Sequence, residues 1–279
     1  MHPATNTPCF PRGWSAETAC RLEATAPKPG NVHPAAEFPD LRYDELVAAG
    51  RAIAPAIDLA WERPLGETIL EAVKASRAVT RSNANLGIVL AIAPLAAVGD
   101  GEDAAHGIER VLGSLTADDA RHVWQAIAVA RPGGLGTAAS HDLAGPPPRD
   151  LLAAMREAAG RDGIARLWAT GYRELFDEVV PDLEREYAVR GRIDDAIVLS
   201  YLQLLARRPD TLVARKHGDA EARRVSAMAA ATLEGDECGL AGRIDAFDRS
   251  LRTPPRRNPG TSADFLAAAL YILLREGRL

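Results

Sequence analysis

The chain is poor in cysteine and in aromatic residues, and it has no long hydrophobic run. Its cysteines form neither a CxxC pair nor an even framework, which excludes a disulfide-stapled scaffold and fits a reducing, cytoplasmic compartment; they are Cys9, Cys20 and Cys238. The longest apolar run has 13 residues, 86–98, and contains Pro94, whereas a membrane span needs about 20. We therefore expect no membrane partner. Residues 1–13 lack a basic region followed by an apolar stretch, so we also expect no secretory signal.

Most sequence signatures of common enzymes are absent too. There is no GxxxxGK[ST] phosphate loop, GxGxxG turn, HExxH or GxSxG motif, and the six histidines are scattered. The charge balance is mildly acidic, with 33 Lys and Arg against 38 Asp and Glu. A nucleic-acid-binding protein needs a net basic face. These features disfavour nucleic acid as a partner and give no support to the usual hydrolase and dehydrogenase templates.

The residues that are abundant favour helices. The chain has 53 alanines among 279 residues, and alanine is the best helix former. Apolar residues recur at helical spacing between loops rich in Gly and Pro, and no segment alternates with the period of a strand. We predict an all-α fold, in which residues 1–14 form an irregular tail and residues 15–279 form a single compact domain of about ten helices. Residues 83–99 are apolar on all sides and predict a buried central helix. No heptad seam is visible, and a homodimer is compatible with the sequence.

Polar islands between the predicted helices are the candidate functional segments. Lys and Arg beside Gly suit phosphate, because a fixed positive charge lies next to backbone N–H groups. Asn and Asp nearby suit Mg²⁺. The islands span residues 28–33, 83–87, 133–142, 210–218 and 258–264. No single island is specific, but their order along the chain is.

That order resembles the triphosphoribosyl-dephospho-CoA synthase family over about residues 16–275. EATAPKPGNV (23–32) is similar to the TPKPG segment of the family, and NPGTSAD (258–264) is similar to its SPGGSAD segment. The chain resembles a divergent member, because Ala84 stands where Thr is usual, Thr261 replaces a Gly, and an acidic element is reduced to AAEFPD (35–40).

The resemblance implies a transferase that joins ATP to 3′-dephospho-CoA. In this reaction the 2′-hydroxyl of the acceptor attacks C1′ of the ATP ribose, adenine leaves, and the product is 2′-(5″-triphosphoribosyl)-3′-dephospho-CoA. Such an enzyme needs cations and Mg²⁺ for the triphosphate, a carboxylate base, and hydrogen-bonding groups for adenine.

Each of these roles has candidate residues. Those for nucleotide binding are Lys28, Gly30, Asn31, Asn83, Asn85, Arg215, Lys216, Gly218 and Ser262, with Asn83 and Asn85 assigned to adenine. Glu23, Asp40 and Asp142 are candidate catalytic carboxylates, and Asp210 and Asp264 are candidate ligands of Mg²⁺. Which carboxylate acts as the base stays open at this point.

Structural roles compete with these assignments. Asp264 lies three residues after Thr261, which is the spacing of a capping box, and Asp40 can cap the helix that follows it. Asn85 can satisfy the first amides of a buried helix, and Arg215 and Lys216 can be helix-end charges. Two functions also compete with the first: a related ribosyl-group transferase with another acceptor, such as a pterin or one-carbon carrier, and a non-catalytic all-α binding protein.

Overall fold

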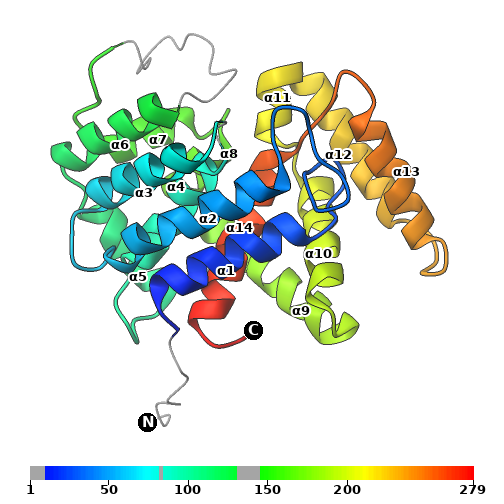
Figure 1. Cartoon of the computed structure of the whole chain (residues 1–279), viewed down its shortest axis with the longest axis horizontal. Coiled ribbons are helices and arrows are strands. Elements are labelled where there is room, and N and C mark those ends of the chain that lie inside the picture. Colours follow the sequence, from blue (N-terminus) through cyan, green and yellow to red (C-terminus); the bar gives the residue numbers. More distant parts are fainter. Residues whose placement is uncertain (1–9, 82–83, 131–144) are drawn as a thin grey trace.

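The computed structural model describes residues 10–81, 84–130 and 145–279, and this part of the chain is all-α (Figure 1). It forms one compact domain of fourteen α-helices and one π-helix within these ranges, more than the ten or so helices predicted, in part because the predicted helix 162–179 is divided by a turn and residues 211–217 form a helix of their own. The first seven helices are α1 (Arg12–Thr25), α2 (Tyr43–Asp58), α3 (Leu65–Val79), α4 (Leu86–Ala96), α5 (Ala104–Gly113), α6 (Ala117–Ala130) and α7 (Leu151–Ala158). They are followed by α8 (Gly163–Ala169), η1 (Leu175–Val179), α9 (Val180–Arg190), α10 (Ile193–Arg207), α11 (Thr211–His217), α12 (Asp219–Leu233), α13 (Leu240–Arg252) and α14 (Gly260–Arg275).

The helices form two groups joined by a central layer (Figure 1). Helices α3 to α8 lie on one side and α9 to α13 on the other. Between them, α14 packs against α1, α4 and α10, and α1 packs against α2. Because α14 touches both groups, its first turn lies where the two groups meet.

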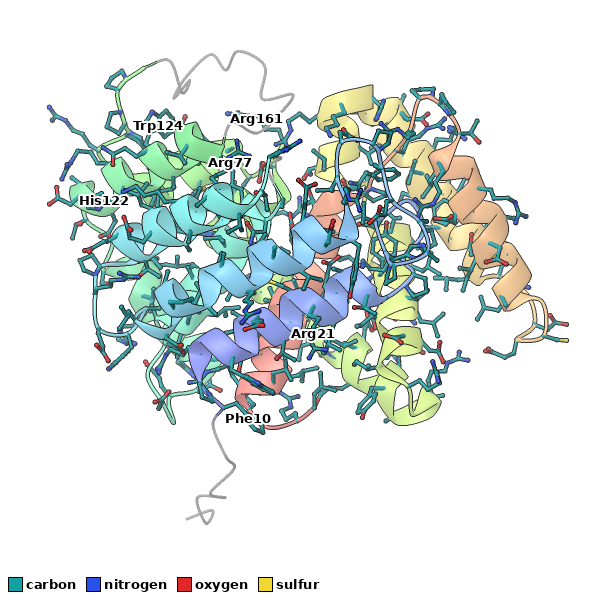
Figure 2. All side chains as sticks on the ribbon, in the orientation of Figure 1. Phe10, Arg21, Arg77, His122, Trp124 and Arg161 are labelled. Carbon is teal, nitrogen blue, oxygen red and sulfur yellow. The ribbon has the colours of Figure 1, made fainter. Side chains whose placement is uncertain are left out.

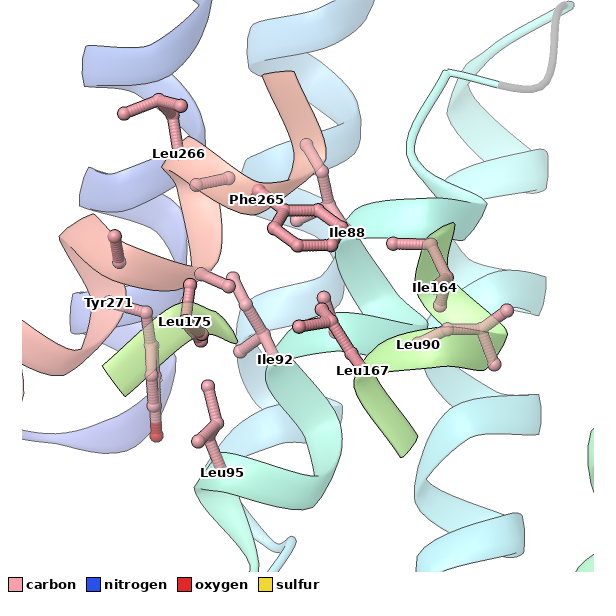
Figure 3. Packing of buried hydrophobic residues seen from close by; sticks show 14 of the residues in the cluster. Ile88, Leu90, Ile92, Leu95, Ile164, Leu167, Leu175, Phe265, Leu266 and Tyr271 are labelled. Atoms are coloured by element: carbon pink, nitrogen blue, oxygen red, sulfur yellow. The ribbon is translucent and has the colours of Figure 1, made fainter. Parts of the chain in front are cut away.

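The predicted central helix is confirmed. Ten of the eleven residues of α4 are buried, as the all-round apolarity of this segment requires. Its side chains Ile88 and Ile92 pack with Leu167 of α8 and Phe265 of α14 (Figure 3). Helix α14 is buried to a similar degree, so the core has two central helices.

Pro94 inside α4 explains a cross-link between α4 and α8. Proline has no N–H to donate to the carbonyl four residues earlier, which is that of Leu90. The indole N–H of Trp168 donates to this carbonyl at 2.9 Å, and the hydroxyl of Tyr172 donates to the carbonyls of Leu90 and Ala91 at 3.2 and 3.0 Å. Both side chains are buried, so they supply the hydrogen bond that proline removes.

The same region corrects one helix prediction. The periodicity predicted one helix over residues 162–179, but α8 ends at Ala169 and η1 follows after a turn. Gly171 and Tyr172 both have φ of 62°, in the left-handed region. Tyr172 adopts this unfavourable conformation for a residue with a side chain where its hydroxyl reaches the carbonyls of α4. The tertiary contact therefore overrides the local pattern.

Two further boundaries differ from the predictions. Residues 12–14 were predicted to belong to an irregular tail, but α1 begins at Arg12, so these residues and Ser15 lie inside the helix. Residues 211–217, expected as a loop, form α11. None of the helices in the described parts of the chain combines the length and the apolarity needed to cross a membrane.

Candidate active site

A cavity of about 1410 Å³ opens where the two helix groups meet. Helices α4, α6, α7 and α8 line one wall, and α11, α12 and the start of α14 line the other. Residues 38–41 form part of the rim. Pockets for one small ligand usually measure about 300–1,000 Å³, so this cavity has room for two substrates.

Asp210 fixes the floor of this cavity by joining the starts of α11 and α14. One of its oxygens, Oδ1, accepts the backbone N–H groups of Leu212 and Val213 at 2.9 and 3.0 Å. The other, Oδ2, accepts the N–H and the hydroxyl of Ser262 at 2.7 and 2.8 Å. Burial raises the pKa of this carboxyl, against the lowering effect of these four donors. Asp210 and Ser262 therefore support the site from behind its surface.

Thr211 ties a third helix to the same point. Its hydroxyl oxygen accepts the N–H of Gly163 at 3.0 Å and lies 3.1 Å from the hydroxyl of Thr261. The starts of α8, α11 and α14 thus converge. Hydrogen bonds between three helix ends make this floor rigid.

Asp264, the fifth residue of α14, is one of the carboxylates that line the cavity. Its carboxylate accepts no hydrogen bond from the described residues. Its pKa lies well above the usual value because burial disfavours the charged form and because the carboxylates of Glu23, Asp210 and Asp162 are near. The Arg215 guanidinium acts in the opposite direction. Among the described residues, Asp264 therefore forms no ion pair, and Arg215 is the cation that acts on it.

Gly87 of α4 permits the close approach of Asp264. A Cβ at this position would overlap Oδ2 of Asp264 and lie 2.6 Å from its Cγ. Any larger residue at position 87 would thus displace the carboxylate.

Asn85 presents a free hydrogen-bond donor beside Asp264. Its side-chain oxygen accepts the Ser76 hydroxyl at 2.6 Å, while Nδ2 is buried and has no partner in the described structure. Asn85 is only 5% exposed and lines the cavity. Leaving a buried donor unpaired costs about 1–3 kcal/mol, so this amide is suited to a ligand with an acceptor atom.

The wall formed by α11 and α12 is cationic. Arg215 pairs with Asp162 at 3.4 Å. Lys216 and Arg223 line the cavity without a counter-carboxylate among the described residues. Arg161, between α7 and α8, lines the other wall and is likewise without one; it is labelled in Figure 2. Exposed positive charges without protein partners suit phosphate groups.

The rim carries Asp40 and an aromatic residue held between two cations. Asp40 lies 3.4 Å from the Arg256 guanidinium, and its side chain is 78% exposed. The guanidinium carbons of Arg252 and Arg256 lie 5.3 and 4.8 Å from the ring centre of Phe38, within the range of a cation–π contact. These contacts fix residues 38–40 against the start of the segment that leads into α14.

The segment around Lys28 lies outside the cavity wall. Lys28 is fully buried, and its ammonium lies 2.9 Å from Oε1 of Glu23. Gly30 has φ of 76°, and its N–H donates to Asp248 at 2.8 Å. Asn31 donates from Nδ2 to the Tyr201 hydroxyl at 2.8 Å. The polar groups of this segment therefore bind other protein groups and do not face the cavity.

The structure thus divides the predicted site residues into four sets. Asp40, Asn85, Arg215, Lys216 and Asp264 share the cavity. Asp210 and Ser262 lie directly behind its floor, and Gly218 links α11 and α12 with φ of 89°. Glu23, Lys28, Gly30 and Asn31 form a buried support that does not line it. Asn83 and Asp142 lie outside the described residues, as does the whole Gly-rich island 133–142.

The residues predicted to bind Mg²⁺ do not fit a protein-held cation. Both oxygens of Asp210 are occupied by donors, which leaves Asp264 alone. The described residues contain no group of three or more His, Cys, Asp or Glu side chains that could hold a metal ion. Magnesium is usually bound through few carboxylates together with substrate phosphates, so the ion fits this site only as part of a nucleotide complex.

Several cavity residues were not predicted from the sequence. Arg161 and Arg223 belong to the cationic lining. Asn258, which lies in the predicted island 258–264 but was given no role, presents a buried Oδ1 without a partner among the described residues. Arg161 stands in a Gly-Arg-Asp-Gly turn, which has the same cation-beside-glycine pattern as the predicted islands. Arg223 lies within α12, and nothing in the local sequence distinguishes it from other surface arginines.

Comparisons with known proteins agree with this architecture. The family model described as ATP:dephospho-CoA triphosphoribosyl transferase matches residues 11–279. A crystal structure from Archaeoglobus fulgidus, provisionally named a triphosphoribosyl-dephospho-CoA synthase, is similar with a TM-score of 0.65 and 25% identity. The similarity covers 83% of this chain and 99% of that one. No curated protein matches the chain.

Proposed function

The chain belongs to the ATP:dephospho-CoA triphosphoribosyl transferase family, and from that premise we propose that it transfers the triphosphoribosyl group of ATP to the 2′-hydroxyl of 3′-dephospho-CoA. The bond between C1′ and N9 of adenine breaks, a bond from C1′ to the acceptor oxygen forms, and the hydroxyl proton leaves with adenine. The observation that carries the proposal is one cavity of about 1410 Å³ whose described lining combines cations without protein partners, a free amide donor and a carboxylate that forms no ion pair.

The nucleotide donor fits the α11–α12 wall. Lys216, Arg215 and Arg223 present positive charge to the cavity, where a triphosphate would receive charge-assisted hydrogen bonds. Magnesium enters as the MgATP complex, carried by the phosphates. Nδ2 of Asn85 is then free to donate to a ring nitrogen of the leaving adenine.

Asp264 is the carboxylate best placed to accept the acceptor proton. Of the three candidate catalytic carboxylates, Asp142 lies outside the described residues, Glu23 is already paired with Lys28, and Asp40 lies exposed at the rim. Asp264 lines the cavity, and its raised pKa makes it a stronger base than an ordinary carboxylate once ionised. Its negative charge also suits the positive charge that develops at C1′ when adenine leaves.

The proposal is tested by mass spectrometry after incubation of the full chain with MgATP, with and without 3′-dephospho-CoA. We expect adenine release and the triphosphoribosyl adduct only when the acceptor is present. Adenine released only with another acceptor, such as a pterin, would favour the alternative transferase. A chain that binds no MgATP in isothermal titration would favour the non-catalytic function.

A further inference from the structure

One face of α7 makes an apolar strip along the cavity. Its members recur at positions i, i+3, i+4 and i+7 of the helix: Leu151, Ala154, Met155 and Ala158. From α6 and α4 come the large apolar side chains opposite this strip, namely Trp124, Ile127 and Leu90. This end of the cavity therefore differs in chemistry from the cationic α11–α12 wall.

Arg161 stands at the end of the strip. It follows the last residue of α7, Ala158, by three positions, and its backbone N–H donates to the Ala158 carbonyl at 2.9 Å. From Leu151 to Ala158, seven positions later, the helix rises about 10 Å. The wall thus offers a cation without a protein partner at one end and an apolar track leading away from it.

We propose that this α7 wall, consisting of Arg161 and the apolar strip, binds the acceptor as a nucleotide diphosphate with a long uncharged arm, the pantetheine arm of dephospho-CoA. The inference rests on the proposed function. It assigns the diphosphate to Arg161 and the methyl and methylene groups of the arm to the strip, while the amides of the arm face the open cavity. Removing such apolar groups from water favours binding.

The chemistry of the two walls separates acceptor from donor. ATP has no apolar chain, and three cationic residues on the opposite wall, Arg215, Lys216 and Arg223, suit its triphosphate. If each substrate occupies its own wall, the ribose of ATP and the 2′-hydroxyl of the acceptor meet between the walls, near Asp264. The assignment thus accounts for the size of the cavity and for its mixed lining.

The test uses 4′-phosphopantetheine, which is the arm with one phosphate and without a nucleoside. This probe is titrated calorimetrically into the full chain in the presence of MgATP. Ala154→Trp fills the strip, and Arg161→Gln removes the cation; Arg156→Gln, an exposed α7 residue that does not line the cavity, is the matched control. We expect each of the first two changes to weaken binding at least 10-fold and the control to have no effect.

The affinity for MgATP, measured in each variant, shows that the fold and the donor wall are intact, and it should not change. Equal binding of 4′-phosphopantetheine to the unchanged chain and to Ala154→Trp would overturn the inference, and so would the absence of binding to the unchanged chain. Failure of the proposed function gives a different result, in which the probe binds at the α7 wall but no adenine is released with dephospho-CoA.

Discussion

Lys28 and Lys216 each lie two residues before a glycine, but one is buried and the other lines the cavity. Both were predicted to hold the triphosphate, because each lies close to a glycine. Lys28 is buried against Glu23, whereas Lys216 lines the cavity without a partner in the described structure. A sequence shows that a cation lies near glycine, but the burial of that cation depends on contacts with distant segments.

This difference predicts a stability effect for Lys28→Met. Removing the ammonium leaves the Glu23 carboxylate buried without its cation, which we expect to lower the free energy of unfolding by about 3–5 kcal/mol. Urea denaturation measures the change. Lys74→Met is the control, because Lys74 forms only an exposed pair with Glu71 and such pairs contribute about 0–1 kcal/mol. If Lys28→Met left the stability unchanged and weakened MgATP binding, Lys28 would be a nucleotide-binding residue and not a structural one.

Replacing Asp264 should stabilise the chain, whereas replacing Lys28 should destabilise it. Its pKa in the folded chain is raised well above 3.8, so the folded state holds the proton more tightly than the unfolded state. The free energy of unfolding therefore falls as pH rises from about 3.8 through the folded pKa. Asp264→Asn removes this penalty, and we expect it to raise Tm at neutral pH and to abolish adenine release. Scanning calorimetry between pH 3 and pH 8 should show the Tm difference closing at acidic pH; a constant difference would refute the assignment.

At the scale of elements, the starts of α11 and α14 depend on one carboxylate. Asp210→Ala removes acceptors for three backbone N–H groups and one hydroxyl. We expect a loss of about 2–4 kcal/mol, from the lost helix cap and the unpaired buried donors. Asp150→Ala, which removes the exposed cap of α7 with its single bond to Ala153, should cost about 1 kcal/mol. If urea denaturation showed equal losses for Asp210→Ala and Asp150→Ala, the link that Asp210 makes between α11 and α14 would be contradicted.

The contact between α4 and α14 predicts a second element-scale effect. Gly87→Ala places a methyl group against the Asp264 carboxylate, so we expect loss of adenine release and destabilisation by about 1–3 kcal/mol. Gly242→Ala in α13 meets nothing within 4 Å and should stabilise the chain by about 0.4–1 kcal/mol. If Gly87→Ala behaved like Gly242→Ala, the close approach of Asp264 to α4 would be wrong.

The helical class and the buried α4 could be predicted because alanine content and apolar periodicity act locally. Helix α11 could not, because it has only seven residues, of which the last three are basic. Its start is capped locally by the side chain of Asp210, but the link from Asp210 to Ser262, 52 positions away in sequence, follows no local pattern. The break after α8 depends on Tyr172 reaching α4. Boundaries fixed by long-range contacts are invisible to a local pattern.

At the scale of the whole molecule, the order of the polar islands predicted that distant segments share one site. Asn85, Lys216 and Asp264 do line one cavity, and Asp210 holds two of the segments together. The sequence did not predict the α7 wall. Arg161 and the α7 strip line the cavity only because α7 and α8 face α11 in the folded chain. The cavity is thus a property of how the two helix groups meet across α14.

The most direct test of this account is the dissociation constant of MgATP for Lys216→Ala combined with Arg223→Ala. Isothermal titration of the full chain should show binding at least 10-fold weaker than in the unchanged chain, since two charge-assisted contacts to phosphate contribute about 1.5–3 kcal/mol each. Lys74→Ala, which removes a cation outside the cavity, should bind MgATP as tightly as the unchanged chain. An unaltered constant in the double variant would contradict a triphosphate site on the α11–α12 wall.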